Sequence, residues 1–168
     1  ESVCIVGASD GKFVLPFARD ERRVKAIEMH HTSLRGGTEL FPGGVRREML
    51  GLEGRLREEG LSHLVSITES DFLECPLPRD CGAVFTSCSW HYSQNHREPL
   101  SRYVEKMCST IRPGGIFCAE YMMPVEEKQF RMEHYVLERV LRRLFGKDWR
   151  IVEEFYTEPF VEAPHVGN

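Results

Sequence analysis

Short apolar runs without a polar interruption alternate with segments of helical periodicity along this 168-residue chain. Such runs are typical of strands that are buried on both faces, as in a parallel sheet. Regular alternation of these strands with helices predicts right-handed crossovers between parallel strands. We therefore expect an α/β fold, a doubly wound and mostly parallel sheet in three layers, α/β/α. The predicted strands are residues 3–6, 24–28, 63–68, 81–87, 116–121 and 149–155.

Helical stripes occupy most of the intervals between these strands. Residues 100–111 have the clearest stripe, and the Pro-Gly-Gly sequence at 113–115 ends it because proline cannot continue a helix. Pro16 is compatible only with the first turn or a kink of the helix that follows the first strand. Residues 29–49 have no periodic pattern of apolar residues. Long connections of this kind are usually functional lids or disordered. The predicted helices are residues 13–18, 50–60, 100–111 and 132–145.

The composition is that of a globular domain, with 41% hydrophobic and 29% charged residues. No run approaches the roughly 20 apolar residues of a membrane span. The net charge of −4 provides no basic surface for nucleic acid. We expect one domain over residues 1–168, without a membrane or nucleic-acid partner. Strand-like runs lie close to both ends, which indicates a core from which flanking segments are missing, and a homo-oligomer is left open.

The six cysteines form no Cys-x-x-Cys pair, and several lie in apolar runs where a free thiol acts as a small hydrophobe. No secretory leader is recognised, so we predict a reducing, cytoplasmic compartment without disulfides. His91, His96, His134 and His165 form neither an i,i+4 helical pair nor a His-x-His sequence, so we predict no metal site. The cysteines are Cys4, Cys75, Cys81, Cys88, Cys108 and Cys118.

A glycine-containing turn, Gly-Ala-Ser-Asp-Gly at 7–11, directly follows the first strand. In doubly wound sheets ligands bind beyond the carboxyl ends of the strands, and glycine lets the backbone turn sharply and approach a ligand. Glu28 ends the second strand 17 positions after Gly11, close to the roughly 20 residues that separate a dinucleotide turn from its ribose-binding acid. Asp71 and Phe72 follow the third strand, where they offer an acceptor for the adenine amino group and an apolar face for its ring.

These stretches, with the fourth and fifth strands, resemble the class I S-adenosylmethionine-dependent methyltransferases. The similar segments are VCIVGASDGKFVLPFA, VKAIE, ESDFLECPLP, AVFTSCSWHY and IRPGGIFCAEY, from residue 3 to about residue 155. The closest resemblance is to small single-domain methyltransferases of the tellurite-resistance type. It implies a Rossmann-like methyltransferase fold with a seven-stranded sheet and S-adenosyl-L-methionine as cofactor. The implied cofactor-binding residues are Gly7, Ala8, Ser9, Gly11, Glu28, Met29, Asp71, Phe72, Ser87 and Cys88.

Two departures from the family pattern are visible. The family turn is usually Gly-x-Gly-x-Gly, whereas this chain has Ser9 at the middle position. The family's final antiparallel hairpin and its N-terminal lid helix are incomplete here. These departures keep a second interpretation open, in which the domain is a non-catalytic, methyltransferase-like binding module.

Polar, aromatic and imidazole groups crowd residues 86–96, which the resemblance places beside the transferred methyl group. In methyl transfer the protein mainly positions the two reactants, but a hydroxyl or ammonium acceptor must also lose a proton to a base. Histidine titrates in the required range, so His91 is the first candidate base and His96 the second. We predict N-, O- or S-methylation of a small organic acceptor. Its expected contacts are Trp90, Tyr92, Tyr121 and His134, with Glu120 beside Tyr121.

The same turn also matches other motifs. Gly-Ala-Ser-Asp-Gly fits the Gly-x-Ser-x-Gly elbow of serine hydrolases, and Ser9, Asp71 and His91 follow in triad order. An elbow on the first strand, however, leaves no preceding loop for an oxyanion hole and does not explain Glu28. The nicotinamide fingerprint Gly-x-Gly-x-x-Gly fails at Ser9 and again at Lys12, and no phosphate-binding P-loop is present.

Overall fold

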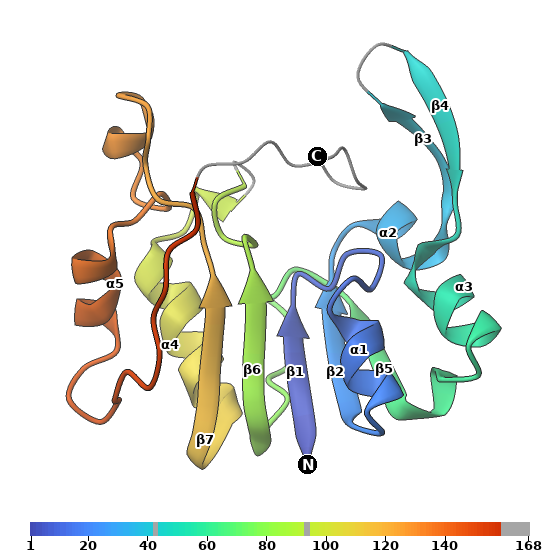
Figure 1. The fold of residues 1–168 in the computed structure, drawn as a ribbon, viewed down its shortest axis with the longest axis horizontal. Coiled ribbons are helices and arrows are strands. Elements are labelled where there is room, and N and C mark those ends of the chain that lie inside the picture. Colours follow the sequence, from blue (N-terminus) through green and yellow to red (C-terminus); the bar gives the residue numbers. More distant parts are fainter. Residues whose placement is uncertain (42–43, 93–94, 159–168) are drawn as a thin grey trace.

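The computed structural model describes residues 1–41, 44–92 and 95–158, and its centre is a parallel sheet (Figure 1). Five strands pair in the order β5-β2-β1-β6-β7, all of them parallel. The doubly wound α/β prediction is confirmed, because helices lie in the β1–β2, β2–β5 and β6–β7 connections and cover both faces of the sheet. The strands are β1 Ser2–Val6, β2 Arg23–Glu28, β5 Val65–Glu69, β6 Cys81–Ser87 and β7 Ile111–Glu120.

Strand β1 lies at the centre of the sheet because its side chains are apolar on both faces. Val3 and Ile5 pack into one core cluster, whereas Cys4 and Val6 pack into the other. All four are buried, as expected from an uninterrupted apolar run. Hydrogen bonding to β2 on one side and β6 on the other leaves β1 without a free edge.

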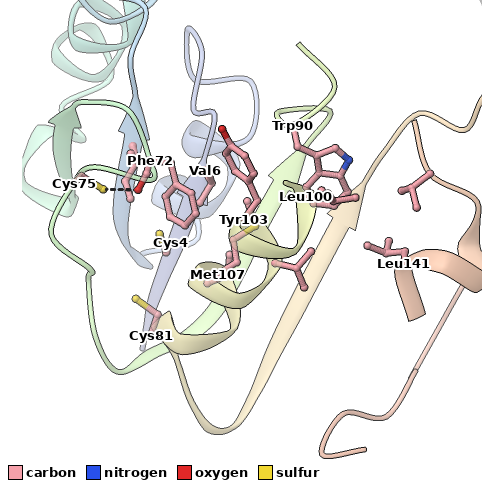
Figure 2. Close-up of a cluster of buried hydrophobic side chains, with 14 residues drawn as sticks. Cys4, Val6, Phe72, Cys75, Cys81, Trp90, Leu100, Tyr103, Met107 and Leu141 are labelled. Atoms are coloured by element: carbon pink, nitrogen blue, oxygen red, sulfur yellow. Dashed lines mark hydrogen bonds between the residues drawn. The ribbon is translucent and has the colours of Figure 1, made fainter. Parts of the chain in front are cut away.

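Helices form the outer layers, with α1 in front of the sheet and α4 behind it in the view of Figure 1. The stripe predicted on residues 100–111 is confirmed, because Leu100, Tyr103, Val104 and Met107 of α4 are all buried (Figure 2). The helices are α1 Val14–Arg19, α2 His31–Arg35, α3 Gly51–Glu58, α4 Leu100–Thr110 and α5 Glu138–Leu144. The 3₁₀ turn η1 Ser62–Leu64 lies between α3 and β5, and the 3₁₀ turn η3 Gln129–Arg131 lies between β7 and α5.

Residues 29–49 are more regular than the sequence predicted. They form α2 and an antiparallel hairpin of β3 Gly37–Phe41 and β4 Val45–Met49, which projects beyond the sheet in Figure 1. Leu40 and Val45 are exposed in this hairpin. None of the hairpin residues whose burial is described is buried, and a pattern that relies on burial does not reveal the hairpin.

The C-terminal third differs from the prediction in three places. The helix expected over 132–145 is confined to α5, and residues 149–155 form no strand. Val152 and Phe155 are 82% and 77% exposed, so these β-branched and aromatic side chains have strand propensity but no neighbouring strand to pair with. Strand β7 begins at Ile111 rather than residue 116, with an irregular register around Gly114. The described residues thus contribute five strands to this sheet, not the implied seven.

No helix among the described residues is both long and apolar enough to cross a bilayer. The six cysteines are free thiols. Across residues 1–41, 44–92 and 95–158, no three His, Cys, Asp or Glu side chains gather in a way that would hold a metal ion.

Two glycines hold the base of the β3–β4 hairpin against α3, which gives a stability prediction. A Cβ on Gly51, at φ +71°, would lie 2.2 Å from the Gly36 nitrogen. Gly60 has the same conformation, φ +70°, with nothing within 4 Å. We expect Gly60→Ala to lower the free energy of unfolding by about 1 kcal/mol through the left-handed conformation alone. Gly51→Ala should lower the free energy of unfolding by about 2 kcal/mol more, because its Cβ would overlap the Gly36 nitrogen. Urea denaturation measures both values, and equal losses of free energy would contradict this packing.

Candidate functional site

The sheet has a switch point between the carboxyl ends of β1 and β6. From β1 the chain proceeds to β2 and β5 on one side, then returns to β6 and β7 on the other. Ligands of doubly wound sheets bind in such crevices. A cavity of about 1920 Å³ opens here, lined by the turns that follow all five strands. It exceeds the roughly 300–1,000 Å³ of a typical ligand pocket, because it continues along β7, where Ile116 is exposed.

The glycine turn after β1 forms the floor of this cavity. A Cβ on Gly7, at φ +73°, would lie 2.8 Å from Ser89 Cβ, and one on Gly11, at φ +100°, would lie 2.6 Å from Leu52 Cδ1. Only glycine satisfies both the conformation and the space at these positions. The N–H groups of Gly7 and Ala8 donate to the Ile27 carbonyl at 3.0 and 3.1 Å. The turn is therefore fastened to the end of β2.

Glu28 strengthens this attachment. Its Oε2 accepts the Ser9 N–H at 2.8 Å, and its Oε1 accepts the N–H groups of Met29 and His30, each at 2.8 Å. Ser9 has φ +48°, the left-handed conformation that a glycine would adopt more readily. The half-buried carboxylate thus holds the turn in shape and still lines the cavity. An ionised carboxylate has about four acceptor positions, so one remains for a ligand hydroxyl.

Asp71 and Phe72 lie where the third predicted strand ends, and both line the cavity. Asp71 Oδ1 accepts the Leu73 N–H at 2.8 Å, and its Oδ2 accepts a hydrogen bond from Arg97 at 2.8 Å. Phe72 is buried, with its ring stacked 6.5 Å from Tyr103. Asp71 therefore shapes its own turn and ties it to the loop after β6. No sequence pattern indicated Arg97, because its pairing depends on the path of that loop.

The loop after β6 starts beside the glycine turn and is bound to β7. Ser87 and Cys88 both line the cavity, as the resemblance implied for the cofactor site. Ser87 Oγ donates to Glu120 Oε2 at 2.5 Å, and the Cys88 N–H donates to the Glu120 carbonyl at 2.8 Å. Cys88 has φ +50°, which turns the chain away from the strand direction. The loop's position is thus determined by β7.

Aromatic rings form the wall of the cavity beyond this loop. The His91 ring lies 4.4 Å from that of Tyr92 and 5.7 Å from that of Tyr135, between ring centroids. All three residues line the cavity, and so does Tyr121. Burial, and then the negative charge of Glu154, raises the pKa of Tyr121 to about 12. At neutral pH its hydroxyl is protonated and is no base.

Three residues expected at the acceptor lie beneath the wall instead of in it. Trp90 is 1% exposed and belongs to the core cluster behind the sheet (Figure 2). His134 is 3% exposed and stacks on His96 at 4.6 Å. His96 Nε2 donates to the His91 carbonyl at 2.7 Å, so this ring supports the loop that carries His91. None of the three lines the cavity. Trp90 packs with Val136 and residues of α4, and the His134 ring lies 6.2 Å from that of Tyr103 in α4. His165 lies outside the described residues.

No family model and no curated protein matches this sequence. Its structure matches solved methyltransferase structures. The glycopeptide N-methyltransferase MtfA, complexed with S-adenosyl-L-methionine, aligns with 76% of this chain at 17% identity and a TM-score of 0.53. CcbJ from Streptomyces caelestis aligns with 73% at 16% identity and 0.58. This chain has the fold of S-adenosylmethionine-dependent methyltransferases.

The methyltransferase fold is shared with a protein of another stated activity. The [4+2]-cyclase SpnF aligns with 86% of this chain at 21% identity and a TM-score of 0.61. The chain spans about half the length of these proteins: 49% of MtfA, 43% of CcbJ and 50% of SpnF. The matches do not single out the tellurite-resistance type.

The buried histidine beneath this methyltransferase-like site predicts a pH dependence of stability. Burial, and then His96, lowers the pKa of His134, whose Nε2 has no hydrogen-bond partner among the described residues. Unfolded His134 therefore binds a proton below about pH 6.5 while the folded form resists it. The contribution of neutral His134 to the free energy of unfolding is fully present above that pH and is lost as the pH falls to the lowered pKa. Over this range the free energy of unfolding changes with a slope approaching about 1.4 kcal/mol per pH unit.

Urea unfolding between pH 7.5 and 5 measures this slope. His134→Asn should reduce it, whereas His63→Asn, at an exposed ring, should retain the wild-type slope. A His134→Asn profile parallel to that of the wild type would refute the prediction.

Proposed function

We propose that this chain binds S-adenosyl-L-methionine and transfers its methyl group to a small organic acceptor. The principal observation is the glycine turn of β1, held by Glu28 at the switch point and open to the cavity. MtfA, which has the same fold, has been solved with S-adenosyl-L-methionine, S-adenosyl-L-homocysteine and sinefungin. Free thiols and the acidic balance favour a reducing, cytoplasmic compartment and a small molecule rather than nucleic acid.

The residues present fit this cofactor. Gly7 lines the cavity at the turn where the methionine part would lie, and its missing Cβ lets Ser89 of the loop after β6 pack against this turn. The remaining acceptor position of Glu28 suits a ribose hydroxyl, and the exposed Met29 beside it offers an apolar contact. Asp71 and Phe72 at the end of β5 would border the adenine.

The chemistry asked of the chain is mainly positioning. The bound sulfonium supplies a methyl group that is already activated for displacement. The wall of His91, Tyr92 and Tyr135 orients the acceptor, and orientation alone contributes several kcal/mol to such reactions. His91 is our candidate for removing the acceptor's proton. His96 is a positioning residue, because its Nε2 holds the carbonyl of His91.

A second candidate is binding without methyl transfer. The cyclase SpnF shows that this fold is compatible with another activity, and Ser9 departs from the usual turn. Cofactor binding without turnover over a panel of amines, phenols and thiols would favour this module.

The hydrolase alternative has less support. The hydrogen bonds of Asp71 go to Leu73 and Arg97 rather than to a histidine, so the triad that it requires is not assembled. Inertness of Ser9 towards a fluorophosphonate probe is the expected result.

Replacement of Glu28 tests the proposed function. Glu28→Gln removes the charge and one set of acceptor positions, so we expect it to weaken S-adenosyl-L-homocysteine binding at least about tenfold in isothermal calorimetry. Glu69 is the matched control. It pairs with Glu28 in register on the neighbouring strand, but it binds His31 and Arg35 and does not line the cavity.

Glu69→Gln should leave the affinity unchanged. If wild-type protein binds neither S-adenosyl-L-methionine nor its homocysteine product, the proposed function fails. Equal affinity of Glu28→Gln and wild type would remove Glu28 from the cofactor site.

A further inference from the structure

The carboxylate at the end of β7 lies where a methyl acceptor would meet the cofactor. Glu120 is paired in register with Ser87 and is exposed to the cavity. Neighbouring strands are about 4.8 Å apart, so the end of β7 lies about 10 Å from the end of β1. Ser87 Oγ donates to Glu120 Oε2, which fixes the carboxylate over the strand ends. Glu120 is thus on the acceptor side of the site, opposite Glu28.

The wall around Glu120 is aromatic. Tyr121 follows it directly and lies half-buried against Trp90, with 6.0 Å between ring centroids. Tyr92 and Tyr135 bring two further rings from the loop after β6 and the segment before α5. The faces of such rings attract cations as well as apolar groups. The wall therefore suits an apolar body with a positively charged head.

The charge on this side of the cavity is negative. Arg142 is a cation that acts on Tyr121, and it is already paired with Glu154. Glu138 also acts on Tyr121 and has no ion-pair partner in the described part of the chain. Arg142 also acts electrostatically on Glu138, so one cation faces two carboxylates there, while Glu120 has no ion-pair partner among the described residues. Over the whole cavity, the described lining has eight carboxylates and four basic side chains.

We propose that the methyl acceptor is an aliphatic amine attached to an apolar or aromatic group, with its nitrogen held by Glu120 and its apolar part against Tyr92 and Tyr121. This inference rests on the proposed function and names its substrate class. An anionic acceptor would meet uncompensated carboxylates, and a neutral one would leave them without a partner.

The reaction balances with these groups alone. The ammonium, held by the Glu120 carboxylate, gives a proton to His91, the candidate base, from which it passes to water. The nitrogen lone pair forms the new C–N bond as the C–S bond breaks, and the electron pair of that bond stays on sulfur. The products are S-adenosyl-L-homocysteine and the N-methylated amine. The displacement itself is neither an oxidation nor a reduction that needs a further reactant.

Three probes with one body and different heads test the acceptor class. They are phenethylamine, 2-phenylethanol and 3-phenylpropanoate, titrated by calorimetry into protein saturated with S-adenosyl-L-homocysteine. We expect phenethylamine to bind at least about tenfold more tightly than the alcohol, and the carboxylate to bind most weakly. Incubation with methyl-labelled S-adenosyl-L-methionine should label the amine alone.

Variants assign the preference to residues. Glu120→Gln retains an acceptor for Ser87 Oγ, so the fold is preserved while the charge is lost. We expect it to weaken phenethylamine binding about tenfold and to leave 2-phenylethanol binding unchanged. Glu138→Gln should show a smaller loss of the same kind. Glu105→Gln, on the exposed side of α4 and outside this cavity, is the control and should change neither.

The outcomes separate the two proposals. Failure of wild-type protein to bind S-adenosyl-L-homocysteine in the first titration overturns the proposed function. If that ligand binds but the three probes bind equally, or Glu120→Gln retains full preference for the amine, only the acceptor class is overturned.

Discussion

Three backbone N–H groups that converge on the Glu28 carboxylate are the interaction on which the site depends. Ser9 comes from the turn after β1, whereas Met29 and His30 lead into α2. A charged acceptor makes hydrogen bonds roughly twice as strong as neutral ones, and here it joins two strand ends that the sheet alone would leave as independent loops. The left-handed conformation of Ser9 is maintained by this attachment. The same side chain thus shapes the turn and faces the space where a ribose would lie.

The central part of the fold could be predicted because burial on both faces leaves a strong pattern. Strand β1 is apolar at each position from Val3 to Val6, and β6 and β2 follow from similar runs. Elements at the periphery do not leave such a pattern. The β3–β4 hairpin has exposed residues at Leu40 and Val45, so it was not foreseen, and residues 149–155 were assigned a strand that has no neighbour to pair with.

The positions of candidate site residues could be predicted where topology alone determines them. The Gly7 turn, Glu28, and the Asp71–Phe72 pair lie at strand ends, and the order of the strands brings them together at one edge. The direction of side chains in the irregular segments could not be predicted from the sequence. Tyr135 lines the cavity while its neighbour His134 is buried, a choice made by packing against α4. Whether the cofactor-facing residues bind as the resemblance implies stays a prediction.

The loop after β6 contacts both the strand ends proposed for the cofactor and the end of β7 proposed for the acceptor. Ser89 lies against Gly7, the Cys88 N–H binds the Glu120 carbonyl, and Arg97 binds Asp71. A ligand at Asp71 would compete with Arg97 for the same carboxylate, and Arg97 belongs to the loop that carries the aromatic wall. Coupling between two sites requires such a shared element with more than one arrangement. If the proposed cofactor binds at Asp71, acceptor affinity should therefore depend on whether the adenine end is filled, because this loop contacts both ends of the site.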